Sequence, residues 1–159
     1  MAYLRCAGHG RLLDGQAIAW SVAEGIRGRR WRWTLTTGEG SLVHVGLIEL
    51  DAGGRFARLE LETGTGMLTL HPARDGRTAH GNVVRPDRVD PIAIDWPAAA
   101  SVAISGDPFG SAAAGWLGIG WLIRDDLTLQ QDAIAVPSLE RDRRAVPLLL
   151  EPREWPLEV

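Results

Sequence analysis

The amino-acid sequence predicts a mainly β protein in which a strongly curved antiparallel sheet forms a barrel or half-barrel with little helix. Apolar and polar residues alternate in several short segments, and Gly-rich or Asp-Gly turns separate them at intervals of roughly 8–12 residues. The only stretches of helical composition, residues 97–100 and 111–114, are short and lie close to Gly or Pro. We assign residues 1–159 to a single β-barrel-like domain.

The central part of the chain, residues 41–71, gives the clearest pattern. Residues 42–50 carry apolar side chains on both faces, which predicts a strand covered on both sides. A turn at 51–54 leads into residues 57–62, where Ala57, Leu59 and Leu61 alternate with charged residues. A second turn follows at 64–66, so we expect a three-stranded meander.

Strands are also predicted before and after this meander. Residues 16–23 and 29–35 alternate, and Arg30 and Arg32 point away from the apolar face of the second segment. Ile18, Trp20 and Val22 form the apolar face of the first segment, and Trp31, Trp33 and Leu35 form that of the second. Further strands are expected in segments 80–84, 92–96, 101–105, 116–123, 127–136 and 146–150.

Composition excludes several classes of function. The net charge of −3 argues against nucleic-acid binding, although all 17 basic residues are arginine. Cys6 is the only cysteine, so the chain forms no internal disulfide. Residues 1–15 lack the apolar region of a signal peptide, and no apolar run is long enough for a membrane-spanning helix. We therefore expect a cytoplasmic protein without an integral membrane segment.

Motifs for catalysis, metals and cofactors are missing from the sequence. The four histidines form no close pair with metal-ligand spacing, and no nucleophile elbow, phosphate-binding loop or dinucleotide fingerprint occurs. We predict no metal, no cofactor and no catalytic residues. An enzyme stays open as an alternative, namely a small hydrolase or isomerase that pairs Asp95 or Asp107 with His71 or His80.

Residues 29–33 carry the most suggestive pattern. Trp31 and Trp33 share one face of the predicted strand, and Arg30 and Arg32 share the other. Tryptophan rings stack on sugars and apolar chains, whereas arginine suits phosphate or carboxylate groups. A core strand with a solvated basic face explains the same pattern. Glycines 118 and 120, within the apolar segment 116–123, would let a strand curve around a cavity or form a bulge.

Several segments within residues 41–140 carry a recognisable combination of hairpin and strand patterns. They are residues 50–61 (LDAGGRFARLEL), 68–70, 75–77, 92–95 (IAID) and 136–140 (VPSLE). In these segments the chain resembles a family of small bacterial proteins described as glycolipid-binding. The resemblance implies a strongly curved antiparallel barrel or half-barrel, similar in outline to bacterial lipoprotein-carrier folds, and a lipid or glycolipid ligand. It brings no catalytic residues.

These observations leave three hypotheses. The first is a non-enzymatic protein that holds a small amphipathic ligand, a lipid or glycolipid, in an apolar cavity of the curved sheet. Its predicted ligand-binding residues are Trp31, Trp33, Trp116, Trp121, Arg30 and Arg32. The second is the Asp/His enzyme. The third is a structural or interaction module with a filled core that forms homo-oligomers through an exposed strand edge.

Overall fold

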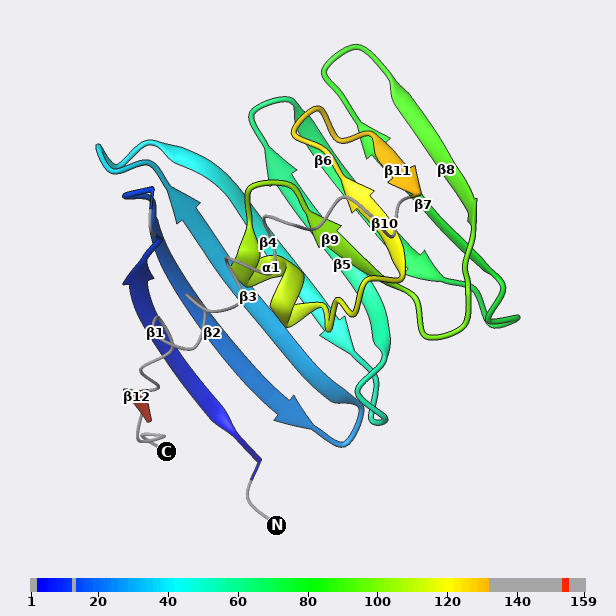
Figure 1. Cartoon of the computed structure of the whole chain (residues 1–159), viewed down its shortest axis with the longest axis horizontal. Helices are drawn as coiled ribbons and strands as arrows, with labels where there is room; N and C mark the ends of the chain where they lie inside the picture. The colour runs from blue at the N-terminus through cyan, green and yellow to red at the C-terminus, as the bar shows by residue number, and fades with distance from the viewer. Residues whose placement is uncertain (1–2, 13, 132–152, 155–159) are drawn as a thin grey trace.

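The computed structural model describes residues 3–12, 14–131 and 153–154, and eight long strands dominate this part of the chain (Figure 1). Each of them pairs antiparallel with the next along the sequence. The strands are β1 (Arg5–Arg11), β2 (Ala17–Gly25), β3 (Gly28–Thr36), β4 (Leu42–Leu50), β5 (Phe56–Thr63), β6 (Gly66–Pro72), β7 (Thr78–Val84) and β8 (Val89–Asp95). The two-residue strand β12 (Arg153–Glu154) pairs with the free side of β1.

The prediction of a mainly β, antiparallel protein is confirmed. Strands β8 and β12 form the two ends of the large sheet, and no pairing joins them within the described residues. The sheet is therefore open there, and it is not strongly curled.

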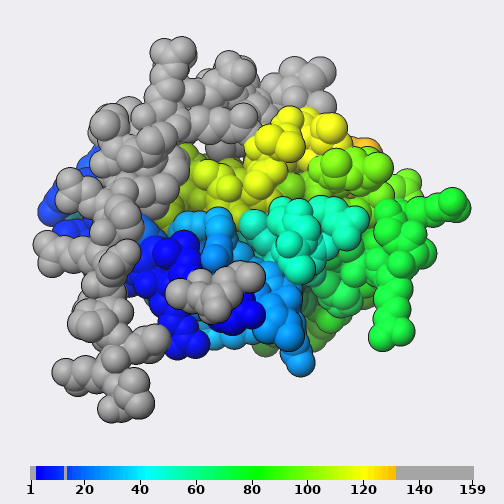
Figure 2. All heavy atoms as spheres, turned by 90° about the horizontal axis from the view of Figure 1, so that it is seen from below, coloured from blue at the N-terminus to red at the C-terminus, as the bar shows by residue number. Residues whose placement is uncertain are grey.

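A second, smaller layer covers one face of the large sheet. It contains β9 (Ser101–Ile104), α1 (Pro108–Ala113), β10 (Gly120–Ile123) and β11 (Leu129–Gln131). Strand β10 pairs parallel to β9, with α1 in the connection between them, and β11 pairs antiparallel to β10. Figure 2, which looks along the layers, shows the yellow β10 region on one side of the sheet strands.

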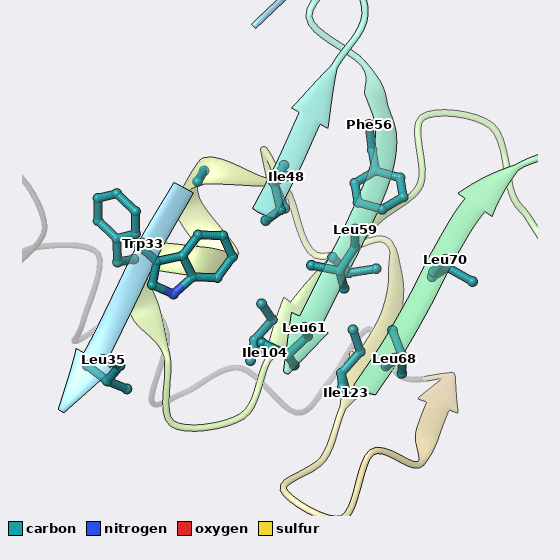
Figure 3. Packing of buried hydrophobic residues seen from close by; sticks show 14 of the residues in the cluster. Trp33, Leu35, Ile48, Phe56, Leu59, Leu61, Leu68, Leu70, Ile104 and Ile123 are labelled. Atoms are coloured by element: carbon teal, nitrogen blue, oxygen red, sulfur yellow. The ribbon is translucent and has the colours of Figure 1, made fainter. Parts of the chain in front are cut away.

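The main core lies between the two layers (Figure 3). Ile48, Leu59 and Leu68 from the sheet are fully buried, and the second layer contributes Ile104 and Ile123. Alternation places these side chains on the inner face of each strand and leaves the outer face to charged and small residues. The burial of apolar surface between the layers is what holds them together.

Helix α1 is short and has clear end signals. The carboxylate of Asp107 accepts a hydrogen bond from the backbone N–H of Gly110, and Pro108 occupies the first turn. Gly115, with φ of +70°, follows the last turn and ends the helix. These signals start the helix before residue 111, whereas the composition had indicated residues 111–114; residues 97–100 form a turn instead.

Most strand predictions are confirmed, but the later ones are too long. Of segment 116–123, only residues 120–123 form a strand, because the preceding residues connect α1 to β10. Of segment 127–136, residues 129–131 are strand. The rest of that segment and the predicted strand 146–150 lie outside the described residues.

Candidate functional site

Strand β3 separates the predicted ligand-binding residues onto two faces of the sheet. Trp31 and Trp33 point to the inner face, where Trp33 is only 2% exposed. Arg30 and Arg32 point to the outer face, as the alternation predicted. The two pairs therefore cannot contact the same small ligand on one side of the sheet.

Trp31 and Trp33 belong to an aromatic group at the edge of α1. The ring centroid of Phe109 lies 5.7 Å from that of Trp31, 5.9 Å from that of Trp33 and 6.0 Å from that of Trp20. Such separations are typical of favourable aromatic contacts. The indole nitrogen of Trp20 is buried and has no hydrogen-bond partner, while Trp31 is partly exposed.

Trp116 and Trp121 lie in the second layer. Trp116 is 2% exposed and packs in a small apolar cluster with Ala103, apart from the main core. Trp121 is partly buried, and its indole N–H donates to the backbone oxygen of Asp95 (2.9 Å). The four predicted tryptophans thus divide between two apolar clusters.

The outer face of β1–β3 carries a depression of about 450 Å³, which we call the arginine trough. Arg5 on β1 and Arg30 and Arg32 on β3 line its sides. Its floor comes from residues with small side chains on β1 and β2: Ala7, Ser21 and Ala23.

Strand register explains why a trough forms there. Ala23 on β2 lies opposite Arg5 on one side and Arg30 on the other. Ser21, also on β2, lies opposite Arg32. Because neighbouring strands are about 4.8 Å apart, the backbones of Arg5 and Arg30 are separated by roughly 10 Å, with only small side chains between them.

Two of these arginines keep free hydrogen-bond donors. Arg30 forms an ion pair with Glu49 (2.6 Å). The guanidinium groups of Arg5 and Arg32, in contrast, form no hydrogen bond or ion pair with any residue that the structure describes. Exposed guanidinium groups beside an apolar floor favour a ligand with an anionic group and an alkyl part.

A second depression of about 480 Å³ continues the trough across β3–β6. It shares Ser21 and Arg32 with the arginine trough. Val45, Leu47 and Met67 supply its apolar side chains, and the carboxylates of Glu60 and Glu62 line it between them. Arg32 therefore lies between the arginine trough and a depression that mixes apolar side chains with two carboxylates.

The Asp/His pair that the structure contains differs from the ones expected. His44 Nε2 lies 2.6 Å from Asp107 Oδ2, and the indole N–H of Trp33 donates to the same oxygen (2.6 Å). All three residues are at most 5% exposed. The carboxylate thus ties α1 to β3 and β4, and a substrate has no access to it.

The predicted partners of Asp107 lie elsewhere. His71 and His80 face each other across β6 and β7 on the exposed side of the sheet. His80 and Asp95 both line a depression of about 440 Å³ beside Trp121, and no hydrogen bond or ion pair joins them. The sequence contains one indication of the observed His44–Asp107 pair: His44 is a titratable residue that alternates in phase with the apolar residues Ile48 and Leu50.

Within the described residues, no three His, Cys, Asp or Glu side chains are grouped so that they could hold a metal ion. No helix in this part of the chain is long and apolar enough to span a membrane. Comparison with protein-family models, with curated proteins and with solved structures found no match to this chain.

Proposed function

We propose that the protein binds a lipid-like or glycolipid ligand with an anionic headgroup, without converting it chemically, in the arginine trough. The observation that supports the proposal is that the guanidinium groups of Arg5 and Arg32 have no partner among the described residues and lie beside a floor of small side chains. A phosphate or carboxylate placed over Ala23 and Ser21 would be within reach of both arginines. Charge-assisted hydrogen bonds to such an anion are the strong ones.

The neighbouring depression offers apolar side chains to the alkyl part of the same ligand, whereas Glu60 and Glu62 in its lining keep the anionic headgroup on the arginine side. Val45 is 38% exposed on the outer face, and Leu47 and Met67 are partly buried beside it. A chain that runs from Arg32 across these side chains would remove apolar surface from water, at about 25 cal/mol per Å². The ligand would lie along the sheet, so this proposal needs no closed barrel.

The second form of the proposal places the ligand in an enclosed site between the two layers. It corresponds to the sequence prediction of a half-barrel cavity lined by tryptophan side chains. It is favoured by the indole nitrogen of Trp20, which is buried without an acceptor, so a ligand oxygen would remove its desolvation penalty. Trp31 beside it is partly exposed. Core side chains fill this region, however, and the layers would have to separate first.

The other two hypotheses receive less support. The buried position of Asp107 and His44 leaves no room for a substrate, which disfavours an enzyme built on that pair. A filled-core interaction module is consistent with the packed interior. It does not account for a trough in which Arg5 and Arg32 form no polar contact with the part of the chain that the structure describes.

The test is a calorimetric titration with dodecyl phosphate below its critical micelle concentration, and with dodecyl maltoside as a neutral ligand of equal chain length. We expect dodecyl phosphate to bind at least about tenfold more tightly, since a hydrogen bond to a charged group contributes about 1.5–3 kcal/mol. Arg32→Gln should remove most of that preference. Ala23→Leu should fill the floor and weaken both ligands.

Arg88→Gln is the matched control, because Arg88 is an exposed arginine that pairs with Asp90, and neither residue lines the trough or the neighbouring depression. It should bind dodecyl phosphate as the unmodified protein does. If Arg32→Gln and Ala23→Leu bind dodecyl phosphate unchanged, the trough is not the site. If only Trp31→Ala weakens binding, the enclosed form of the proposal replaces the trough.

A further inference from the structure

The end of the sheet next to the arginine trough exposes three large apolar or aromatic side chains. Tyr3, Leu4 and Ile26 are 50%, 41% and 78% exposed. The backbone N–H of Glu24 donates to the backbone oxygen of Leu4 (2.8 Å), so these residues belong to neighbouring segments at one end of the sheet. We call this group the apolar tip; Figure 1 shows its elements, the start of β1 and the β2–β3 turn, at the bottom of the sheet.

Ile26 is unusual for its position. Gly25 pairs with Gly28, so Ile26 and Arg27 are the two central residues of a tight hairpin loop. Such loops ordinarily contain Asn, Asp or Gly, because these residues suit the turn backbone and water. An isoleucine there with most of its surface in water adds nothing to the core of the described fold.

The charges around the apolar tip are mixed with a small positive excess, because the carboxylates of Glu24, Glu49 and Asp51 line the same depression as Arg27. Arg5 follows Leu4, and Arg27 follows Ile26 in the loop. Neither guanidinium forms a hydrogen bond or ion pair with a described residue. The nearby Arg29 is paired with Glu24. Apolar side chains with arginines beside them are the combination that inserts into the boundary between anionic headgroups and acyl chains.

We propose that the apolar tip docks on the surface of an anionic lipid bilayer. Arg5 belongs both to the tip and to the arginine trough, and Ala23 on the floor of the trough lies three residues before Ile26. Docking would therefore bring one end of the trough to the plane of the lipid headgroups. The biological role of this docking rests on the proposed function, whereas the docking itself depends only on the apolar tip.

Figure 2 views the molecule from the end of the sheet that carries the apolar tip, with the N-terminal strands in blue.

A control position is found in the β7–β8 hairpin, which lies at the opposite end of the strands because successive turns of a meander alternate between ends. Val89 in that hairpin region is 59% exposed and β-branched. It is therefore a matched control for Ile26.

The experiment is co-sedimentation of the full chain with vesicles of phosphatidylcholine alone, and with vesicles in which about a third of the lipid is phosphatidylglycerol. We expect binding to the anionic vesicles that weakens as salt is added. Ile26→Ser should lower the partition coefficient about tenfold, because it removes an inserted apolar side chain. Arg27→Gln should lower it about fivefold. Val89→Ser should leave it unchanged.

The inference is overturned if the protein sediments equally with both vesicle types, or if Ile26→Ser and Val89→Ser bind alike. A titration of Ile26→Ser with dodecyl phosphate separates this inference from the proposed function. If the unmodified protein binds dodecyl phosphate but no vesicles, membrane docking alone is overturned. Vesicle binding that depends on Ile26, without dodecyl phosphate binding to the unmodified protein, supports docking and overturns the trough.

Discussion

Asp107→Ala should destabilise the protein more than a typical buried substitution does. The carboxylate accepts hydrogen bonds at 2.6 Å from the indole N–H of Trp33 and at 2.8 Å from the backbone N–H of Gly110. It also lies 2.6 Å from His44 Nε2. The side chain is fully buried, so water cannot replace the lost acceptor. Three polar groups would lose their partner at once.

The size of the effect follows from the cost of burying an unsatisfied polar group, about 1–3 kcal/mol each. Three such groups set an upper bound of about 9 kcal/mol. Partial relaxation, such as rotation of the His44 ring, reduces it, and we expect about 3–5 kcal/mol. Asp107→Asn should cost less, about 1–3 kcal/mol. Its single amide oxygen can serve either Gly110 or Trp33, while its NH₂ group faces the other donor.

The assay is urea unfolding followed by tryptophan fluorescence. With a slope of about 2 kcal/mol per molar urea, a loss of 4 kcal/mol lowers the midpoint by about 2 M. Asp126→Ala serves as the control, because this exposed carboxylate accepts only from the neighbouring Thr128; its midpoint should stay close to that of the unmodified protein. The reasoning is refuted if Asp107→Ala loses less than about 1 kcal/mol, or if the Asn variant is the less stable one.

Two further predictions concern packing and pH. In Gly46→Ala, the new Cβ would lie 2.2 Å from ring atoms of Trp33, which Asp107 holds in place, so the free energy of unfolding in urea should fall by about 1–3 kcal/mol. Gly64→Ala is the control, because its new Cβ would have no atom within 4 Å. Equal losses of stability in the two variants would contradict the packing argument. The hydrogen bond from the backbone N–H of Arg77 holds the pKa of Asp75 below its ordinary value of 3.8. The stability that Asp75 contributes is therefore present above pH 3.8 and lost as the pH falls through the lowered pKa, and urea midpoints of Asp75→Asn should fall less steeply in that range. If the urea midpoints of Asp75→Asn and of the unmodified protein fall equally as the pH is lowered, Asp75 makes no such contribution.

The sequence predicted the N-terminal half of the large sheet well, because period-two alternation is a local signal. In β2, Ile18, Trp20 and Val22 were expected on one face, and all three are buried. In β3, the predicted opposition of tryptophans and arginines is confirmed. The residues that share one face of a strand can be identified from the alternation within that strand alone, without knowing which strand pairs with it.

Irregular pairing was invisible in the sequence. The alternation in residues 57–62 placed Ala57 on the buried face with Leu59. In the structure the register shifts, so that Leu50 pairs with Phe56 and Glu49 with Arg58. Ala57 is then the extra residue of a β-bulge, and Phe56 takes the buried position. A bulge depends on how two strands meet, which the pattern of one strand does not record.

The parallel pair β9–β10 was missed for a related reason. Both segments were expected as strands, but their partners depend on the crossover through α1. The Asp107–His44 contact joins residues 63 positions apart and arises only after that crossover places α1 over β4. Sequence spacing could not predict it, and the same holds for the arginine trough, which Arg5 completes from another strand.

The order of the two layers along the chain has a consequence for synthesis in the cell. All eight long strands of the sheet are complete at Asp95, whereas the described part of the layer that covers their apolar face continues to Gln131. At about 5–20 residues per second, the ribosome needs about 2–7 s to synthesise residues 96–131. During that interval the nascent meander exposes Ile48, Leu59 and Leu68 without a cover. A chain that stops after residue 95 should therefore aggregate, and chaperones would meet this protein first through the inner face of its sheet.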